Sequence, residues 1–273
     1  MDPKMSQTNH SSSKHVLCDI DGRGVATVTL NRPDVHNAFD DVLIAALTET
    51  FTRLDSDNTV RAVVLASSGK SFCAGADLNW MKRMASYSYE QNLNDANALA
   101  TMLHTLNTLS KPTIARVQGA AFGGAVGLVA CCDMAVGSKL SKFCLSEVKI
   151  GLIPATISPY VIQAIGGRNA RRYFTTAEVF SSRRARRIGL LSESVTEEEL
   201  DSTIETLLEH ILKNGTNAVS AAKKLIADVV DRVPDETLRN MTSERIANTR
   251  VSSEGQEGLG AFLQKRRPNW YIS

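Results

Sequence analysis

The change in pattern near Pro154 constrains the fold of this chain more than any other feature. Before Pro154, short segments rich in β-branched residues alternate with segments of helical period. The first kind predicts strands at 16–30 (a hairpin), 61–66, 111–117, 134–136 and 142–145, and the second predicts helices at 40–54, 89–109 and 123–131. After Pro154 the pattern is almost wholly helical, with amphipathic stretches at 158–165, 196–213, 217–230 and 234–249. Because repeated strand–strand–helix units bury a sheet under helices, the sequence predicts a layered α/β core followed by helices.

The length of 273 residues suits one large domain with a smaller helical extension. We expect a polar, Ser-rich disordered tail at 1–14, the α/β core at 15–195 and a helical C-terminal region at 196–273. The tail has no apolar core of the kind a secretory signal needs, and no later stretch is long enough to cross a membrane.

The overall charge of +2 excludes a protein that binds polyanions through its bulk charge. The five cysteines have no metal-type spacing, and most lie in apolar stretches, as buried reduced thiols do. The sequence therefore favours a reducing, cytoplasmic setting, and the scattered histidines indicate no metal site. The arginine run at 183–187 has no aromatic stacking partner, so we interpret it as a solvated helix face and expect no nucleic-acid partner.

Three segments rich in small residues carry the chemical signal: Ser71–Leu78, Val117–Gly127 and Phe143–Pro154. Glycine and alanine allow a ligand to approach the backbone closely. Gly124 also lies at the start of a predicted helix, where free N–H groups and the helix dipole favour an anion. An ordinary strand-to-helix turn would explain the Gly123-Gly124 pair taken alone.

Glu147 follows the predicted strand Phe143–Leu145 and precedes an apolar run that ends at Pro154. Partial burial raises a carboxyl pKa and makes the group useful as both proton donor and proton acceptor. The alternative is a surface glutamate paired with Lys149.

Taken together, these three segments resemble the enoyl-CoA hydratase/isomerase, or crotonase, superfamily, and the resemblance extends from about residue 16 to 270. It implies a spiral of repeated ββα units. It also implies that the N–H groups of Ala76 and Gly124 bind the thioester oxygen as an oxyanion hole, with Glu147 as the acid/base group. Preorganised backbone donors of this kind stabilise an enolate without side-chain reorganisation.

Gly127 is the main departure from the hydratases of this superfamily. They hold the attacking water between two glutamates twenty residues apart, and Gly127 stands twenty residues before Glu147. The segment 143–160 resembles bacterial methylglutaconyl-CoA hydratases of leucine breakdown, in which glycine also replaces the first glutamate. This resemblance implies hydration of a methylglutaconyl-CoA-like substrate. Double-bond isomerisation with Glu147 alone stays open, as does a non-catalytic acyl-CoA- or RNA-binding protein.

The resemblance also implies a coenzyme A thioester as substrate, with no further cofactor. Phosphates need local cations, and three basic residues match family positions near the CoA: Arg32, Lys70 and Lys265. Solvated surface charges, or a structural arginine at 32, are the alternatives. The other implied substrate contacts are Ala74, Gly75, Asp77, Leu78, Gly123 and Pro154, although Asp77 is expected mainly to hold its loop. The family's usual assembly implies a homotrimer or a hexamer formed as a dimer of trimers.

Overall fold

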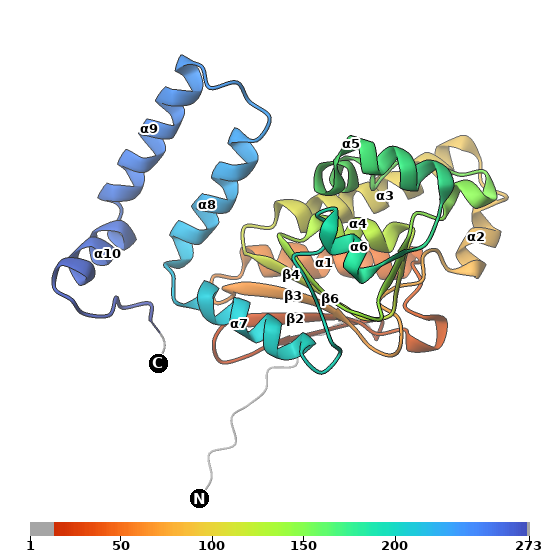
Figure 1. Ribbon diagram of the computed structural model, residues 1–273, viewed down its shortest axis with the longest axis horizontal. Coiled ribbons are helices and arrows are strands. Elements are labelled where there is room, and N and C mark those ends of the chain that lie inside the picture. Colours follow the sequence, from red (N-terminus) through yellow and green to blue (C-terminus); the bar gives the residue numbers. More distant parts are fainter. Residues whose placement is uncertain (1–13, 272–273) are drawn as a thin grey trace, which may run out of the picture.

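The computed structural model describes residues 14–271 and confirms a layered α/β architecture (Figure 1). Most of the predicted tail, 1–13, lies outside the described residues. The main sheet has six strands in the order β1 (Val16–Ile20), β2 (Val25–Leu30), β3 (Ala62–Ser67), β4 (Thr113–Val117), β6 (Met134–Ser138) and β9 (Glu193–Val195). A second sheet joins β5 (Ala120–Phe122), β7 (Lys142–Cys144) and β8 (Phe180–Ser181). Within the main sheet only the β1–β2 hairpin is antiparallel.

Ten α-helices occur in the described part of the chain. They are α1 (Asp41–Ser56), α2 (Leu78–Met84), α3 (Tyr89–Thr108), α4 (Gly124–Cys131), α5 (Ser158–Thr176), α6 (Ser182–Arg187), α7 (Leu200–Leu212), α8 (Thr216–Val229), α9 (Glu236–Val251) and α10 (Ser253–Leu263). The sequence pattern did not predict α2 or α10, and it ended a helix at 165, where α5 has a kink at Gly166 (φ 76°) before it continues to Thr176. α2 and α10 are short, with seven and eleven residues, so their few apolar positions form no extended periodic pattern.

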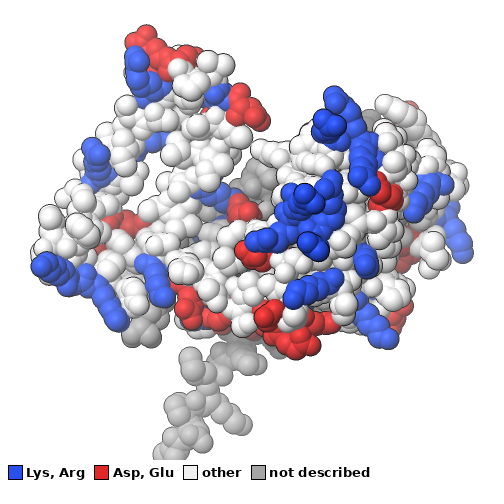
Figure 2. All heavy atoms as spheres, viewed as in Figure 1, with Lys and Arg blue, Asp and Glu red and all other residues white. Residues whose placement is uncertain are grey.

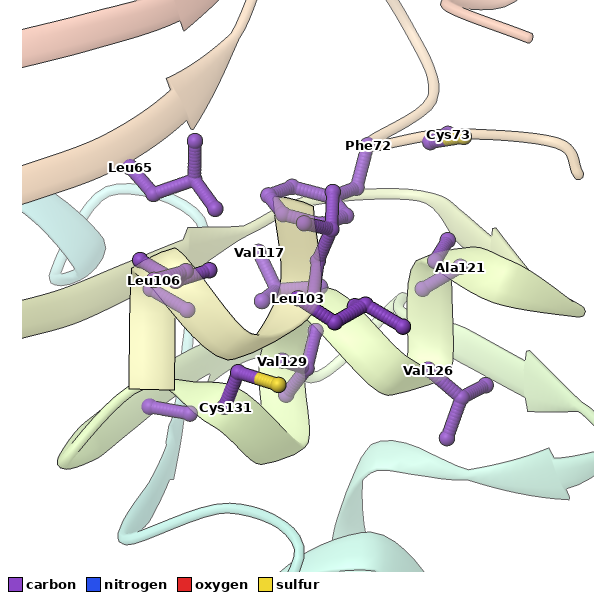
Figure 3. Close-up of a cluster of buried hydrophobic side chains, with 14 of the residues drawn as sticks. Leu65, Phe72, Cys73, Leu103, Leu106, Val117, Ala121, Val126, Val129 and Cys131 are labelled. Carbon is purple, nitrogen blue, oxygen red and sulfur yellow. The ribbon is translucent and has the colours of Figure 1, made fainter. Parts of the chain in front are cut away.

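Strand β3 shows why the core has helices on both sides. All six of its residues are buried, and successive side chains point to opposite faces. Val63 and Leu65 enter the larger core with α1, α3, α4 and α5. Ala62 and Val64 enter a smaller one with α7. Figure 3 shows part of the larger core, where Leu103 of α3 lies among side chains of α4 and the sheet.

The C-terminal helices form two different structures. α7 packs on the sheet, so the predicted boundary at residue 195 precedes a helix that belongs with the core. α8, α9 and α10 extend away from the core as a separate helical arm (Figure 1). Few of their residues are buried, and large apolar side chains stay exposed, among them Val233, Val251, Phe262 (80%) and Leu263 (77%). No helix within residues 14–271 is both long and apolar enough to span a membrane.

Lys223 of α8 connects this arm to the core. Its Nζ donates to Oδ2 of Asp133 at 2.7 Å and to the carbonyl of Lys111 at 3.1 Å. The same carboxylate accepts hydrogen bonds from the backbone and hydroxyl of Thr113 at the start of β4. One carboxylate thus joins the sheet, the end of α4 and the arm.

Replacing Lys223 by methionine should lower the free energy of unfolding by about 1–3 kcal/mol, because Asp133 loses a charge-assisted partner while still partly buried. Lys224→Met is the matched control. Its side chain is exposed and forms no ion pair within residues 14–271, so its effect should stay within about 0.5 kcal/mol. Urea unfolding of both variants measures the difference, and equal values would show that the Lys223 pair does not stabilise the fold.

Candidate active site

The backbone of Ala76 is held on one side only. Phe39 donates its N–H to the carbonyl of Gly75, and Asp77 donates to the carbonyl of Phe39, both at 2.7 Å. In this bridge Phe39 pairs with Ala76, so the N–H of Ala76 lies on the side away from Phe39. It has no acceptor within residues 14–271, and Ala76 is exposed.

Gly124 supplies a second free N–H. It is the first residue of α4, where backbone donors have no partner inside the helix. Its neighbour Gly123 adopts φ 55° and donates to the carbonyl of Cys144 at 2.8 Å. The N–H of Gly124 finds no acceptor in the described part of the chain. Both predicted oxyanion-hole donors are therefore available to a ligand.

The three segments predicted to form the site meet at Gly123. A β-carbon on Gly123 would lie 3.3 Å from Oε1 of Glu147 and 3.9 Å from Cα of Gly75. On the other side of the 73–77 loop, Cys73 pairs with Ala121 of β5, which places the loop beside the start of α4. The fold thus brings together residues that are about 70 positions apart in the sequence (147 − 75 = 72).

Glu147 begins a short 3₁₀ helix, Glu147–Ile150, two residues beyond the end of β7. Its side chain is half-buried, and its Oε2 is buried without a hydrogen-bond partner within residues 14–271. Burial raises the pKa of Glu147 above its ordinary value of 4.5. Lys149 is exposed, and no ion pair of the described residues joins it to Glu147. The sequence-based expectation of a partly desolvated carboxyl is therefore confirmed.

Two free backbone donors beside a desolvated carboxyl can stabilise a developing negative charge and exchange a proton. A family model described as enoyl-CoA hydratase/isomerase matches residues 21–272 of the chain. The chain belongs to this family. The resemblance seen in the sequence and the predicted crotonase-like fold are both confirmed, and the family is one of enzymes.

Relatives of this chain match it over most of its length and over most of their own. An enoyl-CoA hydratase of Alternaria alternata is 32% identical over 247 residues, which are 89% of this chain and 80% of the relative. A 1,2-epoxyphenylacetyl-CoA isomerase of Escherichia coli is 29% identical over 251 residues, covering 91% and 95% of the two chains. The crystal structure of an enoyl-CoA hydratase from Shewanella pealeana is 45% identical with a TM-score of 0.91, covering 94% of this chain and 96% of that one.

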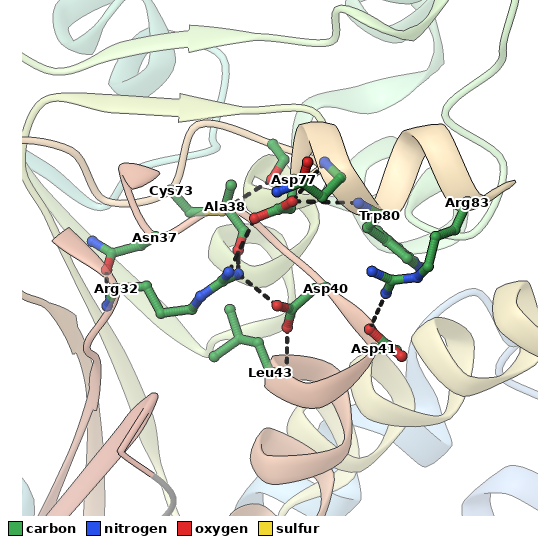
Figure 4. Close-up of polar contacts among 12 residues, drawn as sticks. Arg32, Asn37, Ala38, Asp40, Asp41, Leu43, Cys73, Asp77, Trp80 and Arg83 are labelled. Atoms are coloured by element: carbon green, nitrogen blue, oxygen red, sulfur yellow. Dashed lines mark hydrogen bonds and ion pairs between the residues drawn. The ribbon is translucent and has the colours of Figure 1, made fainter. Parts of the chain in front are cut away.

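Arg32 and Asp77 belong to a network of polar contacts at the loop that follows Ala76 (Figure 4). The guanidinium of Arg32 forms ion pairs with Asp40 at 2.9 Å and Asp77 at 3.0 Å, and it donates to the carbonyl of Ala38 at 2.6 Å. These contacts favour a structural part for Arg32 over the predicted contact with CoA.

Asp77 holds its loop, as the sequence predicts, by capping the first turn of α2. Its Oδ1 accepts the N–H groups of Asn79 and Trp80. Burial alone would raise the pKa of Asp77, but these hydrogen bonds and Arg32 lower it overall. A carboxyl whose pKa falls on folding stabilises the fold above its unfolded pKa and loses this effect as pH falls through the folded value. The contribution of Asp77 is therefore lost in acid, below its ordinary value of 3.8.

The other residues predicted to contact the substrate differ in their exposure to solvent. Ala74 and Leu78 (74% exposed) are accessible next to Ala76, whereas Gly75, Gly123 and Pro154 are buried. Lys70 is exposed in the loop that leads to the site. Lys265 lies on the helical arm, directly after α10, and not beside the core site of its own chain (Figure 1).

The arginine run falls on α6, as predicted, and Figure 2 shows basic side chains gathered over α5 and α6. Arg184 donates to the hydroxyl of Tyr173 and to Asn169, and Arg186 pairs with Glu193. Internal contacts therefore use two of the four guanidinium groups. All five cysteines are free thiols, and residues 14–271 contain no cluster of metal-ligating side chains.

Two residues that shape the site were not predicted. Phe39 orders Ala76 through its backbone, and its ring lies 3.1 Å from where a β-carbon on Gly124 would be. Ile157 is buried against Gly127. Each acts on a partner at least 30 positions away (157 − 127 = 30), so no local sequence pattern identifies either one.

Arg32→Met should lower the free energy of unfolding by about 3–5 kcal/mol, because two largely buried carboxylates lose their cation. Arg83→Met removes a half-exposed pair with Asp41 and should cost at most about 1 kcal/mol. Denaturant unfolding at neutral pH compares the two variants. A similar small loss in both would contradict a structural part for Arg32.

Proposed function

We propose that this chain is an enoyl-CoA hydratase, which adds water across the α,β double bond of an acyl-CoA. The observation that carries the proposal is the convergence of the free N–H groups of Ala76 and Gly124 with the desolvated carboxyl of Glu147. Membership of the enoyl-CoA hydratase/isomerase family and similarity to enzymes named as hydratases support it.

In the proposed reaction the thioester oxygen accepts hydrogen bonds from Ala76 and Gly124, so that the negative charge of the enolate develops against preorganised donors. Glu147 in its ionised form takes a proton from water as the oxygen attacks the β-carbon. The protonated Glu147 can then deliver a proton to the α-carbon. Its raised pKa suits both steps, since the group must gain and lose a proton near neutral pH.

We propose a substrate similar to methylglutaconyl-CoA, which carries a carboxylate at the far end of its acyl group. The support is the segment 143–160 and the glycine at 127, both of which resemble the hydratases of that substrate. In this proposal the substrate carboxylate, or a polar group near it, helps to hold the water that a second glutamate would otherwise hold.

Double-bond isomerisation is the second candidate, because one carboxyl can move a proton between two carbons of a 3-enoyl-CoA without any water. The specific observation in its favour is Gly127, which leaves Glu147 without a carboxylate partner at that position. The similarity to an isomerase of Escherichia coli is compatible with it.

We further propose that Lys70 and, from a neighbouring copy, Lys265 contact the CoA phosphates. Lys265 belongs to the arm, which carries the four most exposed large apolar side chains of the described residues. Apolar residues after Glu147 are also exposed, namely Ile150, Leu152 and Ile153. Burial of both surfaces between copies would remove them from water. A homotrimer or hexamer is therefore the proposed assembly.

Glu147→Gln should reduce kcat by roughly 10²–10⁴-fold with 3-methylglutaconyl-CoA, because the amide cannot exchange the proton. Glu198→Gln, at an exposed glutamate outside the site, is the control and should retain full activity. The loss of conjugated thioester absorbance measures hydration of this substrate and of crotonyl-CoA, and a gain with a 3-enoyl-CoA measures isomerisation. Isomerisation without hydration would favour the second candidate, and no turnover of any of the three would contradict both.

The pH dependence of kcat/KM should show one ionisation on the acidic side, because hydration starts from ionised Glu147. Burial raises the pKa of Glu147, so activity should fall as pH decreases through a value above 4.5. A rate profile measured from pH 4 to 9 tests this, and a midpoint at or below 4.5 would contradict the assignment.

A further inference from the structure

Ile157 occupies the space that a side chain at position 127 would need. A β-carbon on Gly127 would overlap Cγ2 of Ile157 and would lie only 2.8 Å from its Cβ. Ile157 is 1% exposed and stands at the start of α5, which packs on α4. Leu103, at 3.4 Å from the same point, closes a second side, and Figure 3 shows it beside α4. Interiors are close-packed, so this space cannot receive further atoms without a shift.

The position matters because of its place along α4. Residues three apart on a helix are neighbours on its surface. Gly124, whose N–H is free within residues 14–271, is the first residue of α4, and Gly127 follows three residues later with its side facing Ile157. Glu147 therefore lies at the start of α4, with its Oε1 3.3 Å from where a β-carbon on Gly123 would be, and Ile157 covers the next position on the helix surface.

We infer that Ile157 is a specificity-determining residue that restricts the site to one carboxyl group by closing position 127. The inference rests on the proposed function, since it concerns the acid/base groups of that same site. A site restricted in this way favours substrates that bring their own polar group to the water, or reactions that need only one proton carrier. The glycine at 127 and the isoleucine at 157 form a matched pair, and neither can be changed freely without the other.

Thermal unfolding without substrate tests the steric part. Inside a helix, glycine to alanine raises Tm by roughly 2–4 °C, and Gly260→Ala in α10, where the nearest side-chain atom is Nη2 of Arg266 at 3.9 Å, is the control for that gain. Gly127→Ala should instead lower Tm. In the background of Ile157→Gly, which removes both clashing carbons, Gly127→Ala should raise Tm. In the background of Ile157→Val, which retains them, it should still lower Tm.

The chemical part is tested with Gly127→Glu placed in the Ile157→Gly background. Relative to Ile157→Gly alone, this variant should hydrate crotonyl-CoA at least about 10-fold faster, because a second carboxylate can now hold and activate water. Its kcat/KM profile should also gain a second ionisation. A purely structural part for Ile157 would change Tm without changing the shape of this profile.

Two results would overturn the inference. One is a rise in Tm for Gly127→Ala alone, equal to that of Gly260→Ala. The other is a rate profile of the Gly127→Glu, Ile157→Gly variant that keeps the single ionisation of its parent. Failure of the proposed function is distinguishable, since it would appear as absence of turnover by the unmodified enzyme, whereas the Tm measurements need no substrate. If the glutamate variant does not fold, the sign of the Gly127→Ala effect in the two Ile157 backgrounds still decides whether the inference stands.

Discussion

The bridge between Phe39 and Ala76 is the contact on which the site depends. It uses the carbonyl of Gly75 and the N–H of Asp77, so that the N–H between them, on Ala76, has no acceptor within residues 14–271. A backbone donor left in this state costs free energy unless water or a ligand satisfies it. The ion pairs of Arg32 with Asp40 and Asp77 connect the two segments that form the bridge. The free N–H of Ala76, one donor of the proposed oxyanion hole, is therefore set by backbone hydrogen bonds of the fold.

The local patterns identified most elements of the core. The 16–30 hairpin, the long helix that became α3 and the helix that starts at the glycine pair all follow from periodicity and turn residues. The very short strands β5, β8 and β9 did not, since two or three residues show no alternation that could distinguish them from a loop. These strands exist because the rest of the fold supplies partners for them.

The residues of the site also include some that the sequence predicted and others that it did not. Ala76, Gly124 and Glu147 lie in segments with a recognisable composition, and the structure brings those segments together. A structural part for Arg32 was one of the alternatives that the sequence left open, but its carboxylate partners could not be predicted, because they come from two different loops. The contact between Gly127 and Ile157 could not be predicted either, since a glycine in the sequence shows that a side chain is missing but not which neighbour fills the space. Contacts between segments far apart in the sequence determine both, and single-sequence patterns do not contain them.

The buried, unpartnered oxygen of Glu147 has a consequence for the evolution and engineering of this chain. A carboxyl whose charge is desolvated by folding destabilises the native state above its unfolded pKa, so the wild-type residue is not the most stable choice at this position. Natural proteins retain such residues because function requires them, and the stability is recovered elsewhere. A selection for thermostability alone would therefore tend to remove Glu147, whereas the acid/base role proposed for it would be retained only by a screen that includes activity.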